Sequence, residues 1–250
     1  MAIGTNASET VTGTNASETI NGLRGDDLLR GLLGNDTYLF RAGDGQDSIF
    51  DTGGVADSVR FDASVARSSL RLMVDPGEVD DLFIYNDATG QRVEVDEQFN
   101  GTGYRVESIT FANGNAAIDL TKPLTFTGTA AAETMYGTIG NDTIIGRGGV
   151  DSLQGFGGDD IYRFGSGDGQ DSIFDTGGVA DSVRFDASVV RGTLLFSIDP
   201  SDRDDLFITN TVTGSRIEID EQFNGTGYAV ETLYFADSGP SIDLTSLGLA

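Results

Sequence analysis

The 250-residue sequence contains no cysteine and no histidine, and only one of its 15 basic residues, Lys122, is a lysine. Without thiols or imidazoles it cannot form disulfides, zinc sites with such ligands, or catalytic groups of the Ser-His-Asp or Cys-His type. No apolar run is long enough to span a membrane, and the first residues lack the basic and apolar segments of a cleavable signal peptide. We therefore expect neither membrane insertion nor a cleaved leader.

Positive charge is also scarce, since 40 acidic residues give a formal net charge of −25. Such a chain repels nucleic acids and anionic membranes and attracts cations, so no nucleic-acid partner is expected. Hydrophobic residues make up 38% of the chain, and 35 glycines add backbone entropy that folding must overcome. Low apolar content with charge of one sign is typical of chains that do not fold unaided. The composition predicts that something neutralises the carboxylates.

The chain is internally duplicated. The stretch Gly43–Val65 recurs without a substitution as Gly167–Val189, and aligning Gly4 with Gly128 matches the two halves to the end without a gap. We interpret the chain as a tandem duplication and predict two domains, 1–126 and 127–250.

A shorter repeat lies inside each copy. Every ninth residue is a glycine, at Gly4, Gly13, Gly22 and Gly31, and at Gly128, Gly137, Gly146 and Gly155. Acids follow in fixed phase at Glu9, Glu18, Asp27 and Asp36, and at Glu133, Asp142, Asp151 and Asp160. Apolar residues follow two places later at Val11, Ile20, Leu29 and Tyr38, and at Met135, Ile144, Leu153 and Tyr162. Glycines, acids and apolar residues that all repeat every nine residues predict a stacked repeat architecture with the apolar residues in its core.

The units GTIGNDTII, GRGGVDSLQ and GFGGDDIYR resemble the nonapeptide of hemolysin-type (RTX) calcium-binding proteins, and the stretch after them resembles the extension that often follows such repeats. The resemblance implies a right-handed parallel β-roll with two nonapeptides per coil and calcium in its turns. We therefore expect an all-β fold in which β-roll segments, each followed by a β-sheet extension, occur in two tandem copies.

Two nonapeptides per coil place alternate repeats on one edge, where strands of adjacent coils lie about 4.7–4.9 Å apart. Carboxylates stacked there can share a hard cation, which takes about 6–8 oxygen ligands. The strongest predicted Ca²⁺ pairs are Asp142–Asp160, Asp151–Asp171 and Asp27–Asp47, followed by Glu9–Asp27, Glu18–Asp36 and Glu133–Asp151. The first coil of each copy departs from the motif and is expected to act as a cap. The alternative is that these acids and glycines only mark solvated turns.

The extensions, residues 61–122 and 185–246, alternate apolar and polar residues as strands do. The stretch DDLFIYNDATGQRVEVDEQF predicts a hairpin, and Val106–Phe111 and Val230–Phe235 predict further strands. The shared DEQFNGTGY, at Asp96–Tyr104 and Asp220–Tyr228, has two interpretations. It is either a ligand surface, for example for sugar, or a turn with a buried aromatic residue and exposed acids.

The leading hypothesis is a secreted or cell-surface calcium-binding protein with a structural or adhesive role, which folds on binding calcium. Type I secretion without a cleaved signal fits this switch, and the tail SIDLTSLGLA is compatible with it. We also expect end-to-end assembly into a homo-oligomer, filament or surface layer. The alternative is a calcium-dependent module of a larger secreted enzyme, for secretion or for binding a cell-surface polysaccharide. We do not expect an enzyme, because no acid stands apart from the metal or turn pattern, although a β-helical lyase or epimerase could use carboxylates and tyrosines alone.

Overall fold

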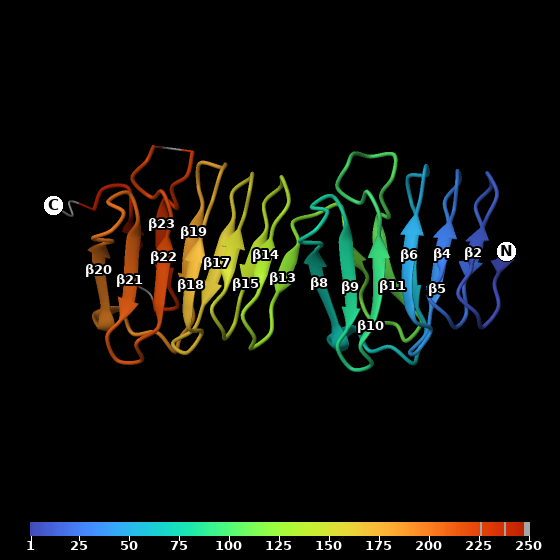
Figure 1. Ribbon diagram of the computed structural model, residues 1–250, viewed down its shortest axis with the longest axis horizontal. Coiled ribbons are helices and arrows are strands. Elements are labelled where there is room, and N and C mark those ends of the chain that lie inside the picture. The colour runs from blue at the N-terminus through green and yellow to red at the C-terminus, as the bar shows by residue number, and fades with distance from the viewer. Residues whose placement is uncertain (226, 238, 248–250) are drawn as a thin grey trace. The chain divides into compact units, whose positions relative to one another are not determined.

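The computed structural model describes residues 1–225, 227–237 and 239–247, and its regular structure is almost entirely β-strand. The chain divides into two compact units, Met1–Lys122 and Pro123–Ala250 (Figure 1). This division lies before the predicted 126/127 boundary, because the strand β13 (Thr125–Thr127) pairs with β15 (Thr143–Ile145) of the second unit. Among the described residues, no helix has the length and apolarity needed to cross a membrane.

Each unit contains two sheets of six strands. In unit 1, sheet A has the order β1 (Ala2–Ile3), β3 (Thr19–Asn21), β5 (Thr37–Phe40), β7 (Ser58–Phe61), β11 (Ser108–Phe111) and β12 (Ile118–Asp119). Sheet B has the order β2 (Thr10–Thr12), β4 (Leu28–Arg30), β6 (Gln46–Phe50), β10 (Gln91–Val95), β9 (Leu82–Asn86) and β8 (Leu70–Val74).

Unit 2 repeats this order. Sheet C runs β13, β15, β17 (Ile161–Phe164), β19 (Ser182–Phe185), β23 (Thr232–Phe235) and β24 (Ile242–Asp243). Sheet D runs β14 (Thr134–Tyr136), β16 (Ser152–Gln154), β18 (Gln170–Ile173), β22 (Arg216–Ile219), β21 (Leu206–Asn210) and β20 (Leu194–Ile198). The described helical structure is limited to the 3₁₀ segments η1 (Arg67–Ser69) and η2 (Arg191–Thr193).

The nonapeptides form the predicted β-roll. Successive strands alternate between the two sheets, and each pairs in parallel with the strand of the next coil, as in Thr19↔Thr37 and Leu28↔Ser48 (Figure 1). One apolar side chain per strand points inward, and the predicted core residues are all buried: Val11, Ile20, Leu29, Tyr38, Met135, Ile144, Leu153 and Tyr162. The ninefold spacing therefore places one core residue per half-coil and leaves the acids at the turns.

The extension continues the roll instead of forming a sheet of its own. Strand β10 pairs in parallel with β6, and β11 pairs in parallel with β7. The predicted hairpin is present, since β9 pairs with β10 antiparallel, and β8 then pairs with β9. The extension strands β10 and β11 thus pair directly with β6 and β7, the strands of the last coil of the roll.

In four of the nonapeptide turns, the residue directly after the first glycine has a left-handed backbone conformation although it is not glycine. These residues are Leu23, Leu32, Arg147 and Phe156, with φ of 73°, 74°, 67° and 69°. Residues with a β-carbon rarely adopt this conformation, so each such turn is strained. The strain is retained at the turns that hold the acidic side chains.

Candidate metal centres

The acids of successive coils are linked into ladders by their own backbones. The N–H of Asp27 donates to Oδ1 of Asp47 at 3.0 Å, and the N–H of Asp36 donates to Oδ1 of Asp57 at 2.6 Å. In unit 2 the same bonds join Asp142 to Asp160, Asp151 to Asp171 and Asp160 to Asp181, at 2.7, 3.0 and 2.6 Å. The backbones of Glu9, Glu18 and Glu133 donate likewise to Asp27, Asp36 and Asp151, each at 2.9 Å. All six predicted pairs are therefore brought together, one coil apart.

The second carboxylate oxygen of most of these aspartates is buried and has no hydrogen-bond partner. Seven Oδ2 atoms share this state, those of Asp27, Asp36, Asp47, Asp57, Asp151, Asp160 and Asp181. A buried carboxylate oxygen without a partner costs free energy, and several of them in register cost more. The folded chain thus presents anionic oxygens that require a ligand the protein does not itself supply.

The glycines beside these oxygens leave space for that ligand. A β-carbon on Gly146 would lie 2.6 Å from Oδ2 of Asp151, and one on Gly31 would lie 2.5 Å from Oδ2 of Asp36. Backbone carbonyls approach other glycines of the same register, among them that of Gly155 beside Gly137. Carboxylate and carbonyl oxygens without nitrogen or sulfur donors fit a hard cation such as Ca²⁺. Bound there, the ion would supply the positive charge that joins one coil to the next.

Burial and mutual repulsion also change how these groups titrate. Burial raises the pKa of Asp47, Asp57, Asp171 and Asp181 to about 7, with a further increase from neighbouring carboxylates. The pKa of Asp160 is raised to about 8, again mainly by burial. The charged form of each group is therefore unfavourable in the folded chain without a cation.

The predicted ligands of the first coil differ from the rest. The backbone N–H of Thr5 donates to the carboxylate of Glu9, and that of Thr14 to Glu18, where hydrogen bonds from Thr14 lower the glutamate pKa. In unit 2 Thr129 donates in the same way to Glu133. These longer side chains fold back onto their own turns, which agrees with a capping role for the first coil.

Asp142 behaves like the glutamates. Its Oδ1 accepts from the N–H of Leu124 at 3.2 Å, and its Oδ2 accepts from the N–H and hydroxyl of Thr138 at 2.6 and 2.8 Å. Both oxygens are satisfied by the protein, whereas Oδ2 of its stacked partner Asp160 is not. The Asp142–Asp160 pair thus has one unpartnered oxygen instead of two.

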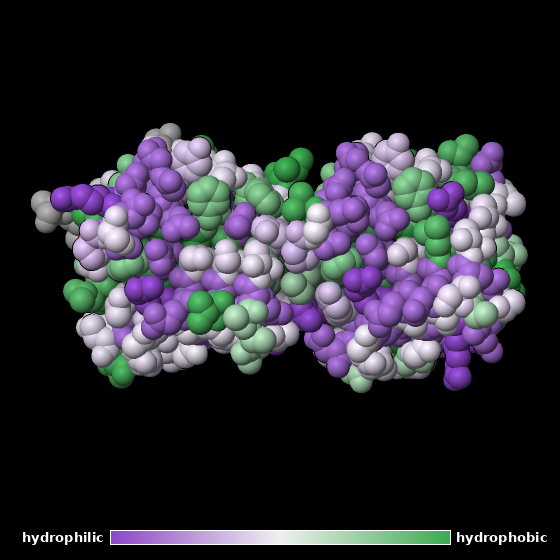
Figure 2. Space-filling view, in the orientation of Figure 1, coloured by the Kyte–Doolittle hydropathy of each residue, from purple (hydrophilic) through white to green (hydrophobic). Residues whose placement is uncertain are grey.

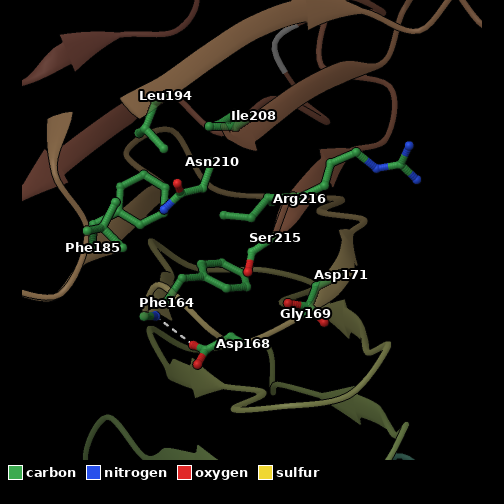
Figure 3. Close-up of a pocket in the computed structure, with 13 residues that line it drawn as sticks. Phe164, Asp168, Gly169, Asp171, Phe185, Leu194, Ile208, Asn210, Ser215 and Arg216 are labelled. Atoms are coloured by element: carbon green, nitrogen blue, oxygen red, sulfur yellow. Dashed lines mark hydrogen bonds between the residues drawn. The ribbon is translucent and has the colours of Figure 1, made fainter. Parts of the chain in front are cut away.

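Asp171 lies beside a small cavity of unit 2. This cavity, of about 20 Å³, is lined mainly by apolar side chains including Phe164, Phe185 and Leu194 (Figure 3). On its polar side, Asp168 accepts a hydrogen bond from the N–H of Gly165 at 2.6 Å. The space is sufficient for about one water molecule and too small for an organic substrate.

Sequence analysis missed four buried aspartates at the last coil. Asp51 and Asp57 join Asp36 in a cluster whose ligand oxygens lie within 4.8 Å of one another, and Asp175 and Asp181 join Asp160 in the same way. Asp57 and Asp181 continue the ladders, and a signal was present: each follows a glycine pair in the duplicated stretch, ten residues after Asp47 or Asp171. The extra residue in this spacing breaks the ninefold count, and this hid the signal.

Two further carboxylate groups occur in the extension. Asp75, Asp81 and Glu94 lie within 4.8 Å in unit 1, as do Asp199, Asp205 and Glu218 in unit 2. The glutamates are paired with arginine, Glu94 with Arg92 at 3.1 Å and Glu218 with Arg216 at 3.5 Å. Their charge is thus partly neutralised within the protein, unlike that of the roll clusters.

The shared DEQFNGTGY forms a turn held by its glutamine. Buried Gln98 donates from Nε2 to the carbonyl of Val106 at 2.9 Å and accepts from the N–H of Val106 at 2.8 Å. Gln222 and Val230 repeat both bonds in unit 2. Tyr104 lies 6.2 Å from Phe50, between ring centres, and is 40% exposed. This geometry accounts for the segment as a structural turn; Thr226, in its second copy, lies outside the described residues.

Comparison with known proteins gives two family matches. The model of the RTX calcium-binding nonapeptide repeat matches residues 3–38, 12–49 and 136–171. The haemolysin-type calcium binding protein related domain matches residues 81–115, which include β9, β10 and β11. No curated protein sequence matches the chain significantly.

Among solved structures, the chain is similar to the crystal structure of extracellular lipase LipA from Serratia marcescens. The two are 17% identical, and the match covers 86% of this chain and 36% of the lipase chain with a TM-score of 0.25. A score this low says nothing about activity. The nonapeptide matches in both units, together with the stacked carboxylates, show that this chain contains RTX calcium-binding nonapeptide repeats of the haemolysin type, folded as a β-roll.

Proposed function

We propose that the chain is an extracellular structural or adhesive protein whose two domains fold when calcium binds between their coils. The observation that carries the proposal is the row of buried aspartate Oδ2 atoms without a partner. Each such oxygen disfavours the folded state until a cation reaches it, so metal binding and folding become one event. A chain of net charge −25 has few other means of overcoming this repulsion.

This linkage suits secretion in the unfolded state. In a cytosol kept low in calcium the chain would remain largely unfolded, and at the millimolar calcium outside the cell it would fold. We infer export by type I secretion on this ground. Of the tail that sequence analysis considered as a signal, residues 248–250 lie outside the described residues.

We infer that the chain is not an enzyme. Among the described residues, the buried carboxylates of the roll lie at its turns, and one glutamate in each carboxylate group of the extension is paired with an arginine. The apolar cavity of unit 2 holds about one water molecule. Neither arrangement places a free acid and a free base around a space that a substrate could occupy.

Self-assembly is supported by unpaired strand edges. The end strands of the sheets include β20 in unit 2, where Leu195 is 55% exposed, and β1 and β2 in unit 1. Unpaired backbone groups of an edge strand can pair with another chain. On the face drawn in Figure 2, hydrophobic residues form separate patches.

A second candidate function, polysaccharide binding, is favoured by a basic groove of unit 2. Arg163, Arg184 and Tyr234 line it on the outer face of sheet C, with the guanidinium of Arg184 5.0 Å from the ring centre of Tyr234. Arginine beside an exposed aromatic ring is suited to an acidic sugar. The equivalent positions of unit 1 are Leu39, Arg60 and Thr110, so this combination is particular to unit 2.

Calcium titration of the full chain tests the leading proposal. Circular dichroism and calorimetry should show sheet formation and binding together, with reversal by chelator. Sheet content that is the same in chelator and in millimolar calcium would contradict it.

Electron microscopy in calcium tests assembly. The edge variant Leu195→Lys should stop assembly. Particles of the unaltered chain that stay monomeric in calcium would contradict assembly.

The groove is tested by glycan arrays in calcium. The double variant Arg163→Leu, Tyr234→Thr converts the unit 2 groove to the pattern of unit 1 and should abolish binding to acidic glycans. Retained binding, or binding only to neutral glycans, would reject the groove as the site.

A further inference from the structure

The last coil of each unit contains a carboxylate cluster that the stacking of nonapeptides does not explain. Asp36 and Asp57 belong to one ladder at the end of sheet A, but Asp51 follows β6 and reaches the cluster from sheet B. All three are buried, at 0%, 1% and 1% exposure. Unit 2 repeats the arrangement with Asp160, Asp175 and Asp181, so two copies of the fold build the same constellation.

A core tyrosine fixes the third carboxylate. Tyr38, a fully buried residue of β5, donates its phenol hydrogen to Oδ2 of Asp51 at 2.7 Å, while the N–H of Gly53 donates to Oδ1 at 3.1 Å. Tyr162 and Asp175 repeat the phenol bond at 2.7 Å. At this inward position the other described roll strands place apolar side chains without a hydroxyl, such as Leu29, Met135 and the large Phe126. The tyrosine therefore occurs only at the coil where a third aspartate must be held.

Two oxygens of the cluster are left without a partner. The Oδ2 atoms of Asp36 and Asp57 are buried and accept no hydrogen bond. The same is true of the Oδ2 atoms of Asp160 and Asp181. The charges that act on Asp36, Asp51 and Asp57 are those of other carboxylates, including Glu107. A β-carbon on Gly31 would lie 2.5 Å from Oδ2 of Asp36 and 3.1 Å from Oδ2 of Asp51, so the glycine keeps the shared space open.

From these contacts we infer that Asp36, Asp51 and Asp57, and equally Asp160, Asp175 and Asp181, each form a three-carboxylate cation site whose third ligand is positioned by a core tyrosine. The inference deepens the proposed calcium-driven folding and rests on it. It differs from the stacked turn sites in drawing one ligand from the opposite sheet. With three anions, the site should hold a divalent or trivalent ion more tightly than turn sites with two.

The position of the site gives it a structural consequence. The N–H of Asp57 donates to Glu107 at 2.6 Å, directly before β11, which pairs with β7. Asp181 and Glu231 make the same bond at 2.7 Å before β23. A cation here would therefore fix the start of β7, which is the strand that pairs with β11 of the extension. Loading this site should order the extension.

Terbium luminescence in the full chain tests the site directly. The chain has no tryptophan and seven tyrosines, so energy transfer to Tb³⁺ reports ions close to a tyrosine. Asp51→Asn should remove about half of the tyrosine-sensitised emission, and Asp51→Asn with Asp175→Asn should remove nearly all of it. Both substitutions preserve size and an oxygen for the phenol bond. The matched control, Asp119→Asn with Asp243→Asn, alters one exposed aspartate in each extension and should keep the emission.

Tyrosine variants distinguish the aspartate that binds the metal from the tyrosine that transfers energy to Tb³⁺. Tyr38→Phe with Tyr162→Phe should abolish the emission and leave the number of bound calcium ions unchanged, whereas Tyr234→Phe on the outer face should change neither. In calorimetry, the Asp51/Asp175 double variant should bind one calcium ion fewer per unit. Unchanged stoichiometry together with unchanged emission would overturn the inference. Absence of any calcium-induced folding in the unaltered chain would instead reject the proposed function.

Discussion

The backbone N–H of Asp36 lies 2.6 Å from Oδ1 of Asp57 in the following coil, and this bond is the repeating link of the roll. It uses one oxygen of each aspartate to hold the preceding coil and leaves the other oxygen in the space between coils. The same carboxylate thus satisfies a backbone donor of the fold and offers a ligand for calcium. Removing one aspartate should damage both functions at once.

Asp151→Ala should lower calcium affinity more than Glu133→Ala, by about tenfold or more. Asp151 has a buried Oδ2 without a partner and stacks with both Glu133 and Asp171, whereas the carboxylate of Glu133 accepts from the backbone of Thr129. Calorimetric titration of the two variants measures the difference. Equal losses would contradict the register in which acids of alternate repeats share ions.

The roll could be predicted from the sequence because its period is fixed. Gly146, Asp151 and Leu153 each have a defined task, and the ninefold count places them at the turn, the ladder and the core. Four of the six predicted pairs follow from this count, whereas Asp27–Asp47 and Asp151–Asp171 lie 20 residues apart. Asp142 shows where the count is insufficient, because the neighbouring Thr138 hydroxyl, not the period, decides the state of its second oxygen.

The three-carboxylate clusters and the course of the extension could not be predicted in this way. Asp51 meets Asp36 only because β6 ends, in the opposite sheet, at the edge where β5 begins, a relationship that no linear spacing shows. The parallel pairing of β10 with β6 is likewise non-local, since the β8–β9 hairpin intervenes. Alternation predicted strands here, but it carries no information about which sheet they join.

The metal-free chain should become less stable as pH rises from about 5 to about 8. The folded-state pKa values of Asp47, Asp57, Asp171 and Asp181 are raised to about 7, and that of Asp160 to about 8, above the ordinary value of 3.8. In this window the folded state binds more protons than the unfolded state, so the free energy of unfolding falls with increasing pH.

Circular dichroism in chelator at the two ends of this range measures the folded fraction, which should be larger near pH 5 than near pH 8, where the chain is expected to be largely unfolded. Calcium should reverse the trend, because it binds the deprotonated carboxylates and its affinity rises with pH. A metal-free chain that gains stability between pH 5 and 8 would show that these aspartates are not buried together in its folded state.

Leu23→Gly should stabilise the calcium-loaded chain by about 1 kcal/mol, because glycine adopts the left-handed conformation of this turn without strain. Phe156→Gly relieves the same kind of strain but removes a stacked contact with Tyr136, whose ring centre lies 5.6 Å away. Such a contact contributes roughly 0.5–1.5 kcal/mol, so the second variant should gain little or nothing. Denaturant melts in saturating calcium compare the two, and a larger gain for Phe156→Gly would contradict this explanation.

Gly155→Ala should weaken calcium binding by about tenfold or more and leave the sheet content in calcium nearly unchanged. The backbone of Gly155 lies outside the left-handed region, so alanine fits its conformation, but the added β-carbon would occupy the space beside Oδ2 of Asp160 and the hydroxyl of Tyr162. Gly192→Ala is the matched control in the same unit, because a β-carbon there meets nothing within 4 Å and the backbone is again ordinary. Calorimetry should show a loss for the first variant and none for the second. If both bind calcium like the unaltered chain, the space between Gly155 and Asp160 does not hold an ion, and the buried oxygen of Asp160 must be neutralised by a proton instead.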